Sequence, residues 1–203
     1  MNPFRGLLAC LEARSKGLCL AVLLALQSAL MPSRSAALEV DGMSFPDEYV
    51  LDGQKLVVNG GGTRLYSWLK VKVYSGVLYA STRSSDAQTL IQTKTPRVLF
   101  VKMRVDSKRS DAVEAWRYYL EHNCSKPCTV ASNRWTPFLE AMADLKEGDT
   151  EAYIFTGSGF ELRRNERSVV KISDAELASL ILAGWLGQEP TTPELKKALL
   201  GRH

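Results

Sequence analysis

The chain has very little histidine. Its 203 residues include only His122 and His203, and His203 is the last residue. Serine and cysteine hydrolases generally need a histidine that takes the nucleophile's proton and is itself oriented by a third group. No pair of carboxylates stands out from a solvated surface either, so the paired-acid chemistry of glycosidases has no support. The sequence therefore disfavours ordinary hydrolytic enzymes.

The chain also lacks an apolar run long enough to cross a membrane. The longest run, Leu18–Met31, is interrupted by polar residues and is shorter than the roughly 20 residues that a spanning helix needs. Basic residues precede it, and Ser35 and Ala37 follow it in the small-x-small pattern of a cleavage site. We expect residues 1–37 to be a cleaved signal peptide and residues 38–203 to be one periplasmic or secreted domain without a stable transmembrane span. An uncleaved anchor and an organelle transit peptide are the alternatives.

An excess of positive charge is absent once this leader is set aside. Residues 1–37 hold four of the 26 basic residues and one of the 22 acidic residues, which leaves 22 basic and 21 acidic residues. Nucleic-acid binding depends on clustered lysine and arginine. We therefore expect no nucleic-acid partner. The remaining length suits one hydrophobic core.

Cysteine is scarce as well, and half of it lies in the leader. Cleavage removes Cys10 and Cys19 and leaves Cys124 and Cys128. In an oxidising compartment such a closely spaced pair indicates a local disulfide. The alternative is a metal site that adds His122, but structural zinc normally takes four ligands and no fourth lies nearby. We predict no metal and no cofactor.

The pattern of apolar residues predicts groups of strands and groups of helices. Period-two alternation indicates strands, and spacings of three and four indicate helices. Asn59–Gly62 is predicted to be a hairpin turn, because asparagine and glycine tolerate positive φ, and no Gly-Lys-Ser/Thr follows to make it a phosphate loop. The expected strands are 38–46, 55–58, 66–79, 97–104, 152–155, 160–163 and 168–172, and the expected helices are 86–92, 110–122, 135–145, 177–185 and one that starts at Pro193. This grouping predicts an α+β domain with an antiparallel sheet covered by helices.

Three of the expected helices carry capping signals at their starts. Ser110 is an N-cap candidate, Ser173–Glu176 reads as a capping box, and Thr192 precedes a proline at the first helical position.

Motifs spread along the chain resemble those of the chalcone isomerase-like family, and most closely its exported bacterial branch. They are Asn-Gly-Gly-Gly-Thr-Arg at 59–64, Lys-Val-Tyr-Ser-Gly-Val-Leu-Tyr at 72–79, Glu-Ala-Trp-Arg at 114–117, Leu-Ala-Gly-Trp-Leu-Gly at 182–187 and the segment 193–201. The resemblance implies an open-faced β-sandwich in which a large antiparallel sheet is backed by helices. This agrees with the α+β fold expected from the pattern.

The resemblance to the true isomerases is incomplete at their site. Arg64 matches their arginine after the glycine turn, and Asn123 matches a helix asparagine. Tyr74 stands where they have a threonine, Trp116 where they have a tyrosine, and Gly184 where they have a late-helix threonine or serine. Because fold does not carry function across, most of the isomerase site is missing here.

The remaining pair resembles the fatty-acid-binding branch of the family, in which an arginine and a tyrosine hold a carboxylate. Arg64 and Tyr74 stand in those places, and Trp116 and Asn123 are further ligand-binding candidates. A guanidinium offers a planar fork of donors to a carboxylate, and a phenol adds one more donor. Candidates for apolar walls are Trp68, Trp116, Phe138 and Trp185.

Each of these residues also has a purely structural interpretation. Arg64 can pair with an acid and fix the turn, Tyr74 and the tryptophans can belong to the core, and Asn123 can cap a helix. The leading hypothesis is a non-enzymatic binding protein for a small apolar carboxylate such as a fatty acid. The alternatives are an isomerase or lyase with Arg64 as electrophile and Tyr74 as acid–base group, and an envelope interaction factor without a small ligand.

Overall fold

The computed structural model describes residues 37–66 and 69–202. The predicted signal peptide, apart from Ala37, and the wall candidate Trp68 lie outside the described residues. Within the described part of the chain, no helix is long and apolar enough to span a membrane.

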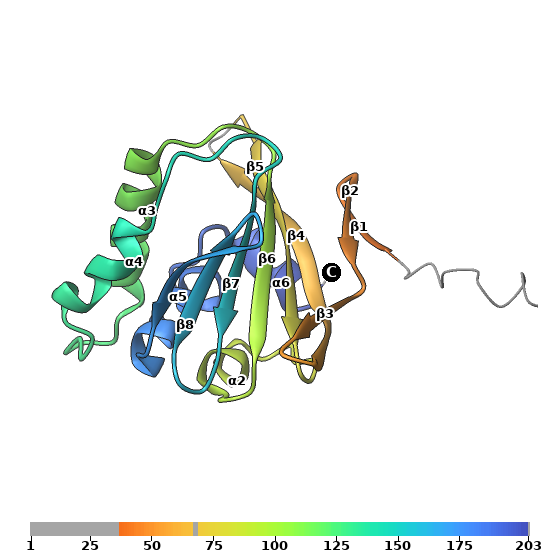
Figure 1. Cartoon of the computed structure of the whole chain (residues 1–203). Coiled ribbons are helices and arrows are strands. Elements are labelled where there is room, and N and C mark those ends of the chain that lie inside the picture. Colours follow the sequence, from red (N-terminus) through yellow and green to blue (C-terminus); the bar gives the residue numbers. More distant parts are fainter. Residues whose placement is uncertain (1–36, 67–68, 203) are drawn as a thin grey trace, which may run out of the picture. The chain divides into compact units, whose positions relative to one another are not determined.

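A seven-stranded antiparallel sheet forms the centre of the domain (Figure 1). Its strands follow one another in chain order, so each pairs with the next through a short connection or through a helix-containing segment. A separate two-stranded ribbon, β1–β2, precedes it. The strands are β1 (Ala37–Val40), β2 (Met43–Pro46), β3 (Glu48–Leu51), β4 (Gln54–Tyr66), β5 (Val71–Ala80), β6 (Arg97–Met103), β7 (Thr150–Phe155), β8 (Phe160–Arg164) and β9 (Arg167–Ile172).

The helices cover one face of this sheet, and the β1–β2 ribbon lies toward the other (Figure 1). This is the α+β, helix-backed antiparallel sheet that the sequence predicts. The helices are α2 (Ala87–Gln92), α3 (Arg109–Asn123), the 3₁₀ turn η1 (Ser132–Trp135), α4 (Thr136–Glu140), α5 (Ala175–Leu186) and α6 (Pro193–Leu199).

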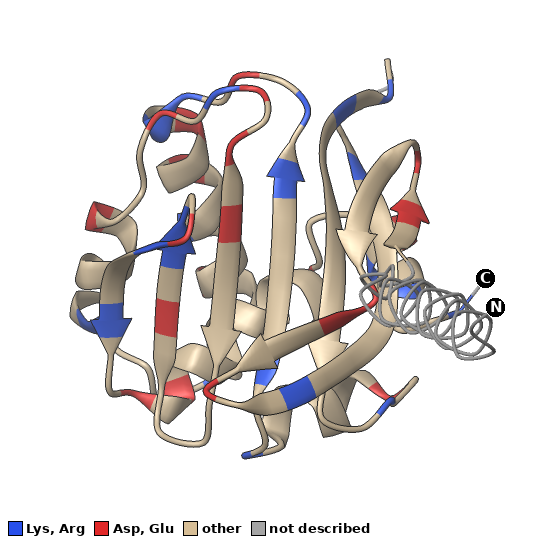
Figure 2. Cartoon of the chain, turned by 45° about the vertical axis from the view of Figure 1, so that its right-hand side comes forward, with Lys and Arg blue, Asp and Glu red and all other residues tan. Residues whose placement is uncertain are grey.

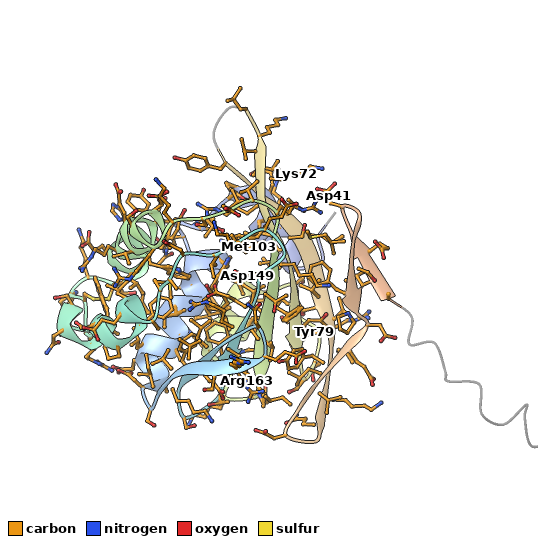
Figure 3. All side chains as sticks on the ribbon, turned by 45° about the horizontal axis from the view of Figure 1, so that its top comes forward. Asp41, Lys72, Tyr79, Met103, Asp149 and Arg163 are labelled. Carbon is orange, nitrogen blue, oxygen red and sulfur yellow. A yellow bond between two sulfur atoms is a disulfide. The ribbon has the colours of Figure 1, made fainter. Side chains whose placement is uncertain are left out.

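Alternation along the strands gives the sheet two apolar faces. On β6 and β7, Leu99, Val101 and Tyr153 belong to the core under the helices, whereas Val98 and Ile154 belong to a smaller core with Phe45 of β2. Figure 3 labels one residue of each face, Met103 under the helices and Tyr79 on the other side. Charged residues are sparse along the central strands and gather at strand ends and loops (Figure 2).

The prediction of a hairpin turn at Asn59–Gly62 is wrong. These residues lie inside β4, where the register shifts between Val58 and Gly60. A Cβ at Gly60 would stand 2.1 Å from the carbonyl oxygen of Ala198 in α6, so glycine is required for the close approach of a helix and not for a turn. The connections between β1 and β2 and between β3 and β4 are instead Asp-Gly pairs, Asp41–Gly42 and Asp52–Gly53, with positive φ at both residues.

Two of the three capping predictions need correction. The N-cap of α3 is Lys108, not Ser110, and the Asp144 carboxylate accepts the N–H of Arg109 at 2.8 Å from a neighbouring loop. The N-cap of α5 is Asp174, whose side chain accepts the N–H of Leu177 at 3.0 Å. The prediction for α6 is confirmed, because Thr192 caps that helix through its side chain.

The helix expected over 135–145 is shorter than predicted. After η1, α4 ends at Glu140, and Leu145 instead forms an isolated antiparallel bridge with Ser107 through two backbone hydrogen bonds of 2.8 and 2.9 Å. Because these bonds use the N–H and C=O of Leu145, the chain leaves the helix before that residue.

Candidate ligand-binding site

A cavity of about 660 Å³ opens between the sheet and the helices, at the end of β6 marked by Met103. Its walls come from β4 to β8, from α3 and from the segments around α5. Arg64, Tyr74 and Trp116 all line it, so three of the four predicted ligand-binding residues are brought together. We call it the Arg64 cavity.

Arg64 and Tyr74 face each other across two neighbouring strands. They are direct partners in the antiparallel register of β4 and β5, and the Arg64 Cζ lies 5.9 Å from the centre of the Tyr74 ring. Side chains at such opposed positions share one face of the sheet and lie side by side. The two residues to which the family resemblance pointed therefore lie side by side.

Arg64 has no acid partner among the described residues. Its Nη2 reaches the Tyr119 hydroxyl at 3.5 Å, at the long limit of a hydrogen bond, and its Nε is buried without any partner. An ion pair that fixes a turn, the structural interpretation of Arg64, is absent from the described part of the chain. The guanidinium of Arg64 therefore has N–H donors that are not used within the described part of the domain.

Tyr74 is buried, with 8% of its surface exposed, and its hydroxyl oxygen accepts the indole N–H of Trp185 at 2.7 Å. Burial raises the pKa of the Tyr74 phenol above its ordinary value, and the charge of Arg64 and hydrogen bonding with Trp185 and Thr191 oppose this. At neutral pH Tyr74 is therefore a neutral phenol with a hydrogen to donate. The Oγ1 of Thr191, also in the wall, is buried.

A second arginine in the wall pairs with a buried acid. Arg164 of β8 donates from Nε and Nη2 to one carboxylate oxygen of Glu151 at 3.0 and 2.7 Å, and Tyr153 donates to the other oxygen at 2.5 Å. Burial, followed by the negative charge of Glu151, raises the pKa of Tyr153 well above its ordinary value. The charge of Arg164 is therefore already paired with an acid of the domain.

The remaining walls combine apolar residues with three acids, Asp106, Asp111 and Glu114. Trp116 packs edge-on against Trp185, with ring centres 4.8 Å apart, and both indoles line the cavity. Val101 and Met103 of β6 form the floor with Tyr153. Phe138, another wall candidate, is completely buried in the core and is not part of the lining.

Asn123 lies outside the Arg64 cavity. Its amide nitrogen donates to the carbonyls of Tyr119 and Glu189, and its oxygen accepts the N–H of Glu189. These bonds tie the end of α3 to the loop after α5, which matches the structural interpretation of this residue. The structure therefore gives no support to the prediction that Asn123 binds the ligand.

The cysteine prediction is met, since Cys124 and Cys128 form a disulfide directly after α3. The metal alternative fails on chemistry, because both sulfurs are bonded to each other and the Nδ1 of His122 lies 2.8 Å from the Tyr118 carbonyl. No group of three or more metal-ligating side chains occurs among the described residues.

Sequence reasoning missed Glu151, Arg164, Tyr153, Tyr119 and Thr191 in this wall. A signal existed for the first of them. Glu151 has the same parity as Tyr153 and Phe155 on β7, and both of these are buried under the helices. An acid in phase with buried residues must find a partner, and no comparable pattern marks Tyr119 or Thr191.

Comparison with known proteins agrees with the fold described above. Among solved structures, a fatty-acid binding protein of Arabidopsis thaliana matches with a TM-score of 0.66 and 14% sequence identity, over 81% of this chain and 96% of that one. No curated protein sequence matches. The profile of the chalcone isomerase-like family matches residues 37–201, and the chain therefore belongs to the chalcone isomerase-like family.

Proposed function

We propose that this protein is a non-enzymatic binding protein for a small apolar acid such as a fatty acid, whose carboxylate is held by Arg64 and Tyr74. The observation that carries the proposal is the unused guanidinium of Arg64. It lines the cavity, has no acid partner among the described residues, and keeps a buried Nε–H without an acceptor. A buried donor without a partner is costly, and a ligand carboxylate removes that cost with charge-assisted hydrogen bonds.

The neighbourhood of Arg64 completes a carboxylate site. The O–H of Tyr74 is a second donor on the adjacent strand, and the buried Oγ1 of Thr191 is a third polar atom in the same wall. A carboxylate has two oxygens with about four acceptor positions, enough for all of these groups.

The size and lining of the cavity favour an apolar remainder. Its volume of about 660 Å³ falls within the roughly 300–1,000 Å³ of typical small-molecule sites. Its mouth carries Tyr66, Val71, Val105 and Tyr118, which are all exposed although they are apolar or aromatic. Exposed apolar groups around a pocket are typical of sites that admit apolar ligands. The fatty-acid binding function of the Arabidopsis thaliana neighbour supports the same ligand class.

Trp116 and Gly184 both depart from the isomerase pattern, and the two residues lie against each other. This supports binding over isomerisation. A Cβ at Gly184 would stand 2.8 Å from the six-membered ring of Trp116. The indole at the place of the family's tyrosine therefore also fills the space that the late-helix hydroxyl would need. Restoring either isomerase group alone would create a clash or a void.

The proposal extends to where the protein works. The leader-like sequence of residues 1–37, the resemblance to the exported bacterial branch and the Cys124–Cys128 disulfide support export to the periplasm or the medium. Native mass spectrometry of protein recovered from the periplasm or medium tests both parts of the proposal. We expect a chain shortened by residues 1–37 that carries a bound acidic lipid.

The sharper test compares lauric acid with dodecanol in the wild type and in Arg64→Met. The two ligands share their chain and differ in the charged group. We expect Arg64→Met to lower the affinity for lauric acid by roughly tenfold to a hundredfold, because it removes charge-assisted hydrogen bonds. The affinity for dodecanol is expected to change by less than about threefold. Isothermal titration calorimetry measures both affinities.

Arg117→Met is the matched control, since Arg117 is an exposed arginine of α3 that does not line the cavity. It is expected to leave both affinities unchanged. If Arg64→Met leaves the binding of lauric acid intact, or if the wild type binds the acid no better than the alcohol, the assignment of Arg64 to a carboxylate is wrong.

A further inference from the structure

A second arginine on the helix-covered face is also without an acid partner. Arg97 begins β6, at the opposite end of that strand from Met103 and the Arg64 cavity. Only 1% of its surface is exposed, and it forms no salt bridge among the described residues. Arginine is almost never fully buried unless it is paired, because an unpaired charge in the interior is costly.

The guanidinium of Arg97 uses only one of its nitrogens. Nη1 donates to the carbonyl of Thr93, the residue that ends α2, while Nε is buried without a partner. Nη2 likewise has no acceptor among the described residues. Nε and Nη2 form the side edge of the guanidinium, the fork that accepts two oxygens of a carboxylate or a phosphate. The hydrogen bond from Nη1 to the end of α2 therefore leaves the Nε–Nη2 edge without an acceptor.

Arg97 remains charged at neutral pH. Burial lowers its pKa to about 10, well above physiological pH. The Cζ also lies 6.0 Å from the centre of the Phe155 ring, a contact that offsets only part of the cost of burying a charge.

Arg97 lines a pocket of about 850 Å³, which we call the Arg97 pocket. α2, α5 and the disulfide loop form its walls, and Lys94 and Lys126 add positive charge. The single carboxylate in the lining is Glu176, which already pairs with Arg134 at 3.0 Å. Uncharged polar residues, among them Gln88, Gln92, Thr129, Thr156, Ser179 and Gln188, share the lining with apolar residues such as Ile91, Val130 and Leu180.

We propose that the Arg97 pocket binds a small oxyanion, the carboxylate or phosphate group of a polar metabolite, on the Nε–Nη2 edge of Arg97. The two lysines beside Arg97 favour an anionic group here, whereas the Arg64 cavity carries exposed apolar and aromatic residues such as Val71 and Tyr66. The two sites lie at opposite ends of β6 and share no lining residue, so either proposal can fail without the other.

The test uses inorganic phosphate and succinate as separate probes on the wild-type protein. NMR follows the side-chain Nε–H signal of Arg97, which is assigned by its disappearance in Arg97→Met. We expect at least one probe to shift this signal in a saturable manner and to raise the melting temperature. Phosphate alone would identify a phosphate ligand, and succinate alone a carboxylate. If neither probe shifts the signal, the proposal is overturned.

Arg97→Met separates ligand binding from a purely structural role. Methionine keeps most of the side-chain volume and removes an unpaired buried charge, so the melting temperature without added anion is expected to stay the same or rise. Added phosphate or succinate should no longer raise it. A variant that melts lower than the wild type in every buffer, combined with a wild type that ignores both anions, would show that Arg97 only caps α2.

A second pair of variants keeps the test valid if Arg97→Met does not fold. Lys126→Ala, at the pocket, is expected to weaken anion binding about threefold, the effect of one charge at a solvated rim. Lys108→Ala, at the opposite end of α3 from the disulfide loop, is expected to leave it unchanged. Equal affinities in the two variants would contradict a site at this pocket.

Discussion

Two arginines in the wall of one cavity have opposite surroundings. Arg164 donates from two nitrogens to Glu151, and its Nη2 also reaches the carbonyl of Ala141 at 3.0 Å. Among the described residues Arg64 forms a hydrogen bond with the hydroxyl of Tyr119 alone, at 3.5 Å, and its Nε has no partner. A paired guanidinium is part of the folded structure, whereas an unpaired one in a cavity wall has donors left for a ligand.

The difference teaches how to separate structural from functional charge on this sheet. Paired arginines recur elsewhere in the domain, since Arg134 pairs with Asp174 at 2.6 Å and Arg163 with Glu161 at 2.8 Å. Arg64 and Arg97 have no acid partner among the described residues, and each lines a pocket. Unused donors on buried charges are therefore the best guide to binding sites in this fold.

Breaking the paired arginine gives the largest expected effect. Glu151→Gln leaves Arg164 as a buried charge without a counterion, and we expect the free energy of unfolding to fall by about 3 kcal/mol. Urea denaturation followed by tryptophan fluorescence measures the change. The variant also converts Arg164 into a second unpaired arginine, so any folded protein should bind lauric acid at least as well as the wild type.

The control for this loss is Glu48→Gln. Glu48 pairs with Lys55 at 2.8 Å on the surface, where the two side chains are 41% and 69% exposed. An exposed pair of this kind stabilises by less than about 1 kcal/mol. Equal losses in the two variants would mean that burial does not set the strength of the Glu151–Arg164 pair.

The family resemblance in the sequence singled out Arg64 and Tyr74, but the residues that pair with Arg164 were not identified from the sequence. The expected strands 55–58 and 66–79 and the expected turn at 59–62 left Arg64 outside any strand, so its register opposite Tyr74 was not predicted and only the family resemblance pointed to this pair. The partners of Arg164 were not predicted either, because Ala141 was placed inside a helix over 135–145 that ends at Glu140. Contacts between residues far apart in the sequence therefore decide which arginine has an acid partner in the described part of the domain and which has none.

The main errors in the fold have a similar physical origin. Asn59–Gly60 has the local composition of a turn, but the approach of α6, about 140 residues later, makes the glycine a packing requirement. The burial of Arg97 was equally hidden, because β6 reads as an ordinary apolar strand and only the cover of α2 and α5 excludes water from its first residue.

An intermediate effect is expected from Tyr74→Phe, which tests the second donor beside Arg64. It removes the acceptor of the Trp185 indole N–H, so we expect a loss of about 1.5 kcal/mol in the free energy of unfolding. It also removes the phenol O–H proposed to reach the ligand carboxylate, and the affinity for lauric acid should fall by about tenfold. Calorimetry and urea denaturation measure the two effects separately.

Tyr79→Phe is the matched control, because Tyr79 is buried on the same strand but faces the other side of the sheet, where its hydroxyl donates to the Pro46 carbonyl at 2.7 Å. It should reduce stability by about 1 kcal/mol and leave the affinity for lauric acid unchanged. If both tyrosine variants lower the affinity alike, the loss reflects general destabilisation and Tyr74 has no direct role.

The smallest effect is expected from Tyr119→Phe, which removes the one polar contact that Arg64 makes. At 3.5 Å this contact is at the long limit for a hydrogen bond, so the free energy of unfolding should change by less than about 0.5 kcal/mol. The affinity for lauric acid should change by less than about twofold, since the ring and its edge-on packing against Trp116 remain. Tyr118→Phe, on the exposed rim, is the control. A tenfold loss of affinity in Tyr119→Phe but not in Tyr118→Phe would contradict this prediction. It would mean that Tyr119, and not Tyr74, is the phenol that binds the ligand carboxylate together with Arg64.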